Sequence, residues 1–268
     1  RSRGSGLSPT AEANSFFAEV EKTLIGLDSL KRAAHDIRNF KGGQLKIACL
    51  PALAMGFMPR VIKSFVDCNP DVTIQLQTRS TSTVHQWVAA QQFDIGIARP
   101  GPDSPKIEME TFAVVNGVCV LPPGHRLAAK PEISPGDLAG EPFISLALED
   151  KTRHLVDDAF RQHGVEPRAV VETQYAATIC GLVLEGVGVS VVSPISAADF
   201  VNRGLVVRPF TVALPFDYML VFAAGQPRTR LAKEFISMMK QELRRADKAV
   251  ALVNGEAPQM LQDPSRCI

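Results

Sequence analysis

Leu45-Lys46-Ile47-Ala48-Cys49 opens the stretch of sequence that decides the fold. A helix-like segment, 58–68, follows this short apolar run, and Asn69-Pro70 ends it. The same alternation then repeats as an apolar run at 72–77, a helix-like segment at 83–91 and an apolar run at 94–98. Short strands that alternate with helices of this length predict a parallel sheet flanked by helices.

A second unit of the same kind follows further along the chain. One strand is expected over 114–121, where Pro122-Pro123-Gly124-His125 ends it with a turn. The later expected strands are 143–146, 169–172, 188–192, 205–209 and 218–223, and the expected helices are 153–163, 176–185 and 230–244. Two such units joined by extended crossings predict an α/β protein of two Rossmann-like lobes, with a cleft between them at the carboxyl ends of the strands.

A long amphipathic helix is expected before the first lobe. Ser8-Pro9 and Glu12 form a start signal, and Lys41-Gly42-Gly43 ends the pattern. Apolar residues recur between them in steps of three and four, at Phe17, Val20, Leu24, Leu27, Leu30, Ala34 and Ile37. A single helix this long cannot bury its apolar stripe alone, which favours pairing with a second helix and hence dimerisation. Packing of the helix on its own domain is the alternative.

Composition limits the classes of function. The chain has 268 residues and a formal net charge of +1, so it has no overall positive field for binding nucleic acid. Its five cysteines are scattered singly, which indicates reduced thiols in a cytoplasmic protein rather than a metal site. No stretch has the length of a membrane span or the apolar core of a secretion signal. Because the chain begins at Arg1 without Met, we expect a truncated or processed product.

Motifs for catalysis are missing from the sequence. It contains no Gly-x-Ser-x-Gly, no HExxH and no P-loop, and its five histidines lie far apart. Gly186-Val187-Gly188 lacks the third glycine of a dinucleotide site and more plausibly ends a helix. The sequence therefore predicts no enzyme, no cofactor and no metal, and an enzymatic alternative would need a catalytic constellation that is not found.

Small and hydroxylated residues gather where strands give way to helices. They follow the first strand at 50–54 and the second at 79–83. Small residues let the backbone approach a ligand, and free N–H groups at a helix start bind carboxylates. Arg99, directly after the strand that ends at Ala98, is positioned to clamp the same carboxylate, or else is an ordinary surface arginine. Glu149-Asp150 is the acidic pair placed to take a cationic end of the ligand.

Five segments in order resemble the LysR-type transcriptional regulators over nearly the whole chain. These segments are 7–12, 43–48, 91–97, 120–128 and 185–190. The run 51–56 is similar to the subgroup that responds to opines and basic amino acids, whereas 79–81 and 146–151 depart from it, so ligand identity does not carry over. The resemblance implies a periplasmic-binding-protein type of fold, in which two lobes sense an inducer behind a long linker helix.

The resemblance also implies a domain organisation and a set of ligand contacts. The domains are a remnant of the DNA-binding winged helix at 1–8, the linker and dimerisation helix at 9–42, lobe I at 43–118 and 219–246, lobe II at 119–218, and a C-terminal tail at 247–268. The ligand contacts are Pro51, Ala52, Leu53, Ser80, Thr81, Ser82, Ala98, Arg99, Leu148, Glu149, Asp150, Gln174 and Tyr175. The expected partners are a carboxylate or amino-acid-like effector, DNA through the absent N-terminal head, and copies of the chain in a homodimer or homotetramer, with no membrane.

The sequence thus predicts the effector-sensing portion of a LysR-type DNA-binding transcriptional regulator. The alternative is a solute-binding protein of a transport system, since two-lobed architectures serve both roles. The missing secretion signal and the long linker helix argue against that alternative.

Overall fold

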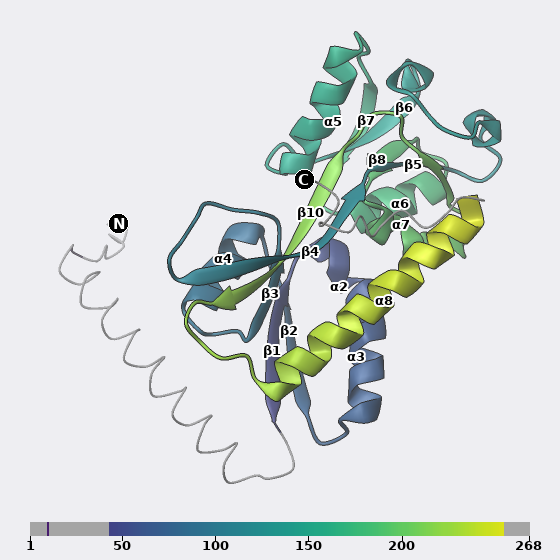
Figure 1. The fold of residues 1–268 in the computed structure, drawn as a ribbon. Coiled ribbons are helices and arrows are strands. Elements are labelled where there is room, and N and C mark those ends of the chain that lie inside the picture. The colour runs from purple at the N-terminus through teal and green to yellow at the C-terminus, as the bar shows by residue number, and fades with distance from the viewer. Residues whose placement is uncertain (1–9, 11–42, 255–268) are drawn as a thin grey trace, which may run out of the picture.

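The computed structural model describes Thr10 and residues 43–254 of the chain. The ranges 1–8 and 255–268, and all of the predicted linker helix except Thr10, therefore lie outside the described residues. The described part is α/β and forms a lower and an upper lobe joined by two long strands (Figure 1). The predicted fold class is confirmed.

Lobe I is built on one five-stranded sheet with the strand order β2-β1-β3-β10-β4. Its strands are β1 (Gln44–Cys49), β2 (Thr73–Thr78), β3 (Ile95–Ala98), β4 (Ile107–Asn116) and β10 (Pro215–Ala223). The first three strands are parallel, whereas β10 runs antiparallel to both of its neighbours. The sequence predicted a parallel sheet, and the return of the chain from lobe II as β10 makes the sheet mixed.

Helices cover both faces of this sheet. They are α2 (Pro51–Ala54), α3 (Phe57–Cys68), α4 (Thr81–Ala89) and α8 (Arg230–Asn254). Successive residues of a strand point to opposite faces, so Ile47 belongs to the same buried cluster as Phe65 of α3, while Ala48 belongs with Val84 of α4. Phe65 meets Phe235 of α8 edge to face at 5.2 Å. Helices α3 and α8 therefore share one face of the sheet and α4 lies on the other.

Lobe II, residues 118–209, carries two smaller sheets. The strands are β5 (Val118–Leu121), β6 (Pro142–Leu146), β7 (Arg168–Thr173), β8 (Ser190–Val192) and β9 (Val206–Pro209). The helices are α5 (Lys151–Gln162), α6 (Ala176–Leu184) and α7 (Pro194–Val201), with short 3₁₀ turns at Arg126–Ala129 and Pro135–Leu138. Strands β6 and β7 pair in parallel, so their carboxyl ends meet at one edge of the lobe.

The two lobes are connected through β4 and β10, which run side by side between them (Figure 1). Their register shifts between Tyr218 and Met219, where Phe112 is the extra residue on β4. The sequence divided the chain after residues 118 and 218, whereas β10 already joins the lobe I sheet at Pro215. The predicted domain boundaries stay a prediction. The second of them, after residue 218, falls at the register shift between β4 and β10.

Several elements differ from their sequence-based expectation. The single strand predicted over 114–121 is wrong, because the chain breaks at Gly117 into β4 and β5. A side chain at Gly117 would press on Phe216, Leu214 and Val191, so the chain passes from one sheet to the other where only glycine fits comfortably. Helices α2 and α7 were not predicted, and α8 continues to Asn254, into the range predicted as a tail.

Candidate functional site

The carboxyl ends of β1, β2 and β3 lie together at one edge of lobe I. The backbone N–H of Leu50 donates to the Ile97 carbonyl at 3.1 Å, and that of Arg79 donates to the Cys49 carbonyl at 3.0 Å. The loops after these strands therefore meet, as the parallel β1-β2-β3 arrangement predicts. Pro51 and Ala52, which the sequence placed in a loop here, form the start of the short helix α2.

Helix α4 starts two residues earlier than the sequence indicated. Ser80 is its N-cap, and the Ser80 hydroxyl accepts a hydrogen bond from the Thr83 backbone N–H at 3.5 Å. Thr81 and Ser82 are thus in the first helical turn rather than in a loop. The Thr81 hydroxyl accepts a hydrogen bond from the Arg99 backbone N–H at 3.4 Å, which joins two of the predicted ligand loops.

Two predicted ligand residues have buried side chains. Leu53 and Ala98 are each 0% exposed, because Leu53 belongs to the main core and Ala98 to the cluster under α4. Their side chains pack in the core, and their predicted role in ligand contact stays a prediction. Both residues are small or apolar and lie where a strand gives way to a loop or helix, so the sequence pattern does not separate core from surface at this point.

The corresponding edge of lobe II carries exposed side chains. Leu146 pairs with Thr173, and the Ala147 backbone N–H donates to the Thr173 carbonyl at 3.0 Å, so the loops after β6 and β7 are neighbours. Leu148 and Tyr175 are 56% and 50% exposed, and Glu149 and Gln174 are also exposed. Within residues 43–254, no hydrogen bond or ion pair ties the side chains of these four residues to lobe I.

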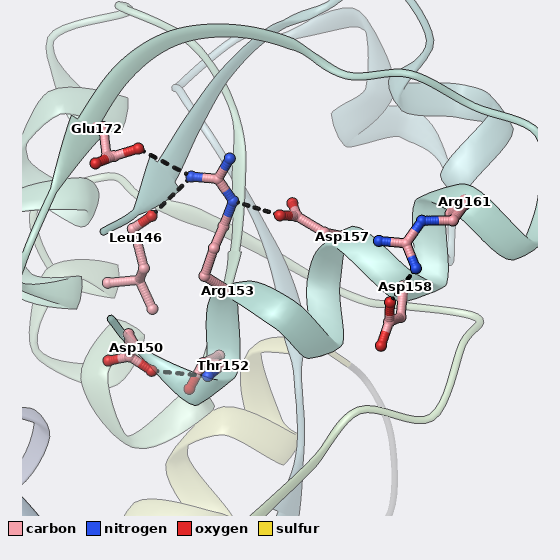
Figure 2. Close-up of polar contacts among 8 residues, drawn as sticks. All are labelled: Leu146, Asp150, Thr152, Arg153, Asp157, Asp158, Arg161 and Glu172. Atoms are coloured by element: carbon pink, nitrogen blue, oxygen red, sulfur yellow. Dashed lines mark hydrogen bonds and ion pairs between the residues drawn. The ribbon is translucent and has the colours of Figure 1, made fainter. Parts of the chain in front are cut away.

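Arg153 holds this edge in place, as Figure 2 shows. Its guanidinium donates to the Leu146 carbonyl at 2.9 Å and to Glu172 at 3.2 Å, and it pairs with Asp157 at 2.7 Å. Arg153 therefore joins the end of β6, the end of β7 and helix α5. Arg153 is not among the predicted site residues, although Arg153 and Asp157 have the i,i+4 spacing of a helical ion pair, a signal that was available in the sequence.

Asp150 is the N-cap of α5. Its carboxylate accepts a hydrogen bond from the Thr152 backbone N–H at 2.7 Å (Figure 2). An acid at this position is stabilised by the positive end of the helix dipole. The acidic side chain that the sequence assigned to a cationic ligand group thus has a structural role at the helix start as well.

Arg99 bridges the lobes. Its guanidinium donates to the Thr152 hydroxyl of α5 at 3.4 Å and to the Pro215 carbonyl of β10 at 3.2 Å, and it lies over the Phe216 ring at 5.3 Å. Among the described residues, no carboxylate forms an ion pair with Arg99. The cation is therefore held by neutral partners and keeps its capacity to bind an anion.

Tyr218 lies at the register shift close to this arginine. The hydroxyl of this fully buried side chain donates to the Ser193 hydroxyl at 2.9 Å. Burial raises the pKa of Tyr218, the Ser193 hydrogen bond and the Arg99 charge oppose that rise, and the Asp150 charge adds to it. The charges of Arg99 and Asp150 therefore shift the pKa of Tyr218 in opposite directions. No sequence motif indicated the contact between Tyr218 and Ser193, which are 25 residues apart.

His85 lies behind the Arg99 loop. It is 9% exposed, and its Nε2 atom has no hydrogen-bond partner among the described residues. Burial lowers the pKa of His85, the backbone of Arg99 acts in the opposite direction, and the Lys151 charge lowers it further. A side chain at Gly101 would collide with the imidazole ring, so glycine lets this loop lie against His85. His85 thus lies on the buried face of helix α4.

The structure thus links three of the predicted site residues, Thr81, Arg99 and Asp150. Thr81 contacts Arg99, which reaches Thr152 at the N-terminus of the helix that Asp150 caps. Within the described ranges, no three or more His, Cys, Asp or Glu side chains are grouped as metal ligands. No helix among the described residues has the length and apolar character that crossing a membrane requires.

Together, the two-lobed α/β fold and the converging loops define a small-molecule-binding module of the periplasmic-binding-protein type. The family model of the LysR substrate binding domain matches residues 38–244, which is more than half of the chain. The chain therefore belongs to the LysR substrate-binding-domain family. It is the ligand-sensing domain of a LysR-type transcriptional regulator.

Individual relatives agree with this assignment. The chain is 38% identical over 229 residues to the transcriptional activator protein LysR of Escherichia coli (strain K12), covering 85% of this chain and 74% of that protein. It is 32% identical over 239 residues to the octopine catabolism/uptake operon regulatory protein OccR of Rhizobium meliloti, covering 88% and 79%. The solved BenM effector binding domain with its effector benzoate shares the fold with a TM-score of 0.61 at 19% identity, covering 82% of this chain and 97% of that one.

Proposed function

We propose that the domain binds a small carboxylate with an amino group, an amino acid or a derivative of one, where the two lobes meet. The observation that carries the proposal is Arg99, a guanidinium between the lobes that no carboxylate of the described residues neutralises. Arg99 presents a planar fork of donors that suits a carboxylate. Its hydroxyl and carbonyl partners are weaker acceptors than a carboxylate, so an anionic ligand can replace them.

Two helix N-termini support an anion at the same place. Thr81, the first residue of α4, contacts the Arg99 backbone, and Thr152, the second residue of α5, contacts the Arg99 guanidinium. Helix N-termini present free N–H groups and the positive end of the helix dipole. One of these helices belongs to lobe I and the other to lobe II, so a bound carboxylate interacts with both lobes and favours their approach.

Asp150 supports an amino group on the ligand. The charges of Asp150 and Arg99 both affect the pKa of Tyr218, so a negative and a positive side chain both lie near one buried residue at the junction. A zwitterion fits this pairing better than a simple anion, which Asp150 would repel. OccR, one of the relatives, is named for an operon of octopine catabolism and uptake, and its similarity lends weight to an amino-acid-derived effector.

The proposed mechanism is a shift in lobe arrangement. A ligand changes the balance between two arrangements only by its different affinity for each, and a coupling of roughly 1–3 kcal/mol is typical of allosteric proteins. We propose that this shift alters the angle between subunits of a homodimer or homotetramer in the cytoplasm, and so the spacing of winged helix-turn-helix heads on DNA. The relatives reported above are regulators, so the solute-binding alternative gains no support from them.

A thermal-shift screen tests the proposal. The panel contains amino acids, opines, aromatic acids and other small carboxylates, each at several concentrations. A ligand at one hundred times its dissociation constant stabilises the folded state by about 2.7 kcal/mol. We expect the largest shift from compounds with both a carboxylate and an amine, and a smaller one from their amides. A set of hits without any carboxylate would contradict the proposal.

A further inference from the structure

A second arginine also joins the lobes. Arg60, on α3 of lobe I, pairs with Asp199, on α7 of lobe II. Its Nε also donates to Glu242, on α8 of lobe I, at 2.5 Å. In Figure 1 these three helices lie next to one another, and α3 and α8 are on the face of the lobe I sheet opposite α4. Arg60 thus holds one carboxylate from each lobe.

Asp199 is seated on a glycine. Gly56, the N-cap of α3, leaves room for the carboxylate, since a Cβ at this position would lie 1.4 Å from Asp199 Oδ2. The backbone of Gly56 has φ −134°, which is not the left-handed conformation that favours glycine. The lack of a side chain at position 56 is therefore needed for the approach of Asp199 rather than for the local backbone.

The environment of this cluster favours the paired state. The side chains of Arg60, Asp199 and Glu242 are 41%, 25% and 11% exposed. Burial lowers the pKa of Arg60, but the hydrogen bonds and charges of the two carboxylates outweigh this effect and raise it. Lobe II provides only one of these carboxylates, so Asp199 alone carries the interlobe part of the cluster.

The chain links this cluster to the candidate site. Helix α2, which begins with the predicted ligand residues Pro51 and Ala52, packs against α7 and is followed at once by Gly56 and α3. A displacement of the ligand loop therefore acts directly on the segment that seats Asp199.

We propose that Gly56, Arg60 and Asp199 form an interlobe latch, which holds lobe II against lobe I and sets the resting angle between the lobes. The latch adds a contact between the lobes to the covalent connection through β4 and β10, so opening the latch loosens the lobes about those strands. Its effect on effector affinity rests on the proposed function, whereas its effect on lobe motion does not. A loosened domain spends less time in the binding-competent arrangement, so apparent affinity falls.

The test measures the distance between two spin labels by double electron–electron resonance. One label is placed on Cys68, which is exposed at the end of α3, and the other on a Gln162→Cys variant at the exposed end of α5 in lobe II. Cys267 is replaced by serine. Cys49, Cys119 and Cys180 are buried, and burial raises the pKa of Cys49 and Cys180 to about 12, so they react slowly with the label.

Four variants separate an interlobe latch from a merely structural ion pair. Asp199→Asn breaks the lobe II arm by charge, and Gly56→Ala breaks it by displacing the carboxylate while leaving every charge in place. Glu242→Gln breaks only the arm within lobe I. Lys63→Met is the matched control on the same helix, because among the described residues Lys63 pairs with Asp67 of α3 and with no residue of lobe II.

We expect a broader distance distribution, shifted to longer distances, in Asp199→Asn and Gly56→Ala, with Glu242→Gln and Lys63→Met close to the parent. Wild-type distributions in both latch variants, or an equal broadening in Glu242→Gln, would overturn the latch. For whichever amino acid gives the largest thermal shift, the latch variants should lose affinity roughly fivefold, the lower end of typical allosteric couplings. If no panel compound binds, the proposed function fails, but the distances between the labels still test whether the latch holds the lobes together.

Discussion

Arg60 and Arg99 both join the two lobes, but their surroundings differ. Arg60 meets two carboxylates, Asp199 and Glu242, while Arg99 meets the Thr152 hydroxyl and the Pro215 carbonyl. The first cation is neutralised by the protein itself. The second has no charged partner among residues 43–254. The difference suggests that an interlobe arginine is structural when its charge is matched and is available to a ligand when it is not.

The largest expected effect follows from removing the unmatched charge. Arg99→Ala should weaken binding of any carboxylate hit by about 2–5 kcal/mol, or roughly 30-fold or more, because a ligand charge buried between the lobes loses its partner. Isothermal titration calorimetry measures the change. Arg203→Ala is the matched control, since Arg203 is exposed in lobe II and stacks on Phe200 at 5.2 Å. Equal losses in the two variants would remove Arg99 from the site.

For the stability of the fold, the order of the two arginines should be reversed: replacing Arg60 should cost more than replacing Arg99. Arg60→Met should lower the free energy of unfolding by about 1–2 kcal/mol, because it leaves the mostly buried Glu242 with only the distant contact to the exposed Arg245 at 3.9 Å, while solvent screens the more exposed Asp199. Arg99→Met breaks only hydrogen bonds to neutral groups and should cost less. Urea unfolding provides the comparison, with Lys63→Met as the exposed control pair. A control that costs as much as Arg60→Met would show that the latch charge adds no stability.

The fold was predictable because its signals are local. The alternation of strands and helices between residues 45 and 98 corresponds to β1, α3, β2, α4 and β3 within a few residues. Helix α7 was also within reach, since Ser193-Pro194 has the N-cap and first-turn proline of a helix start, but the signal was overlooked. The break between β4 and β5 at Gly117 was not predictable, because its cause is crowding by Phe216 and Leu214, which are distant in sequence.

The site was predictable in part for the same reason. The strand ends indicated that Thr81, Arg99 and Asp150 lie on neighbouring loops, since parallel strands bring their carboxyl ends together, and the structure links all three through Thr152. Their role in ligand binding stays a prediction. The partner of each charge was not predictable. Arg60 and Asp199 are 139 residues apart, and no local pattern encodes that pairing. Sequence located the loops, and only the fold distinguished the paired arginine from the unpaired one.

A smaller effect is expected at the connecting strands, between the two arginines. Tyr218→Phe removes the donor to the Ser193 hydroxyl and should lower the free energy of unfolding by about 1 kcal/mol, since both groups are buried. Tyr175→Phe is the natural control, because Tyr175 is the other tyrosine of the chain and is half exposed. Denaturant unfolding that gives the same value for both variants would mean that the buried hydrogen bond contributes nothing net.

The smallest effect concerns His85, which lies against the loop of the unpaired arginine. Burial lowers its pKa in the folded protein, so the unfolded chain binds a proton at His85 more readily than the folded protein does. The contribution of this group to stability is therefore fully present above the ordinary histidine pKa of about 6.5 and is lost as the pH falls below it. Urea unfolding of the parent and of His85→Gln between pH 8 and pH 5 tests this sign. The parent should lose more stability than the variant on acidification, whereas His154→Gln, which replaces an exposed histidine of α5, should follow the parent. A parent and a His85→Gln variant with parallel profiles would show that His85 accepts its proton in the folded state, and the contact between His85 and the Arg99 loop would then tolerate a second positive charge beside Arg99.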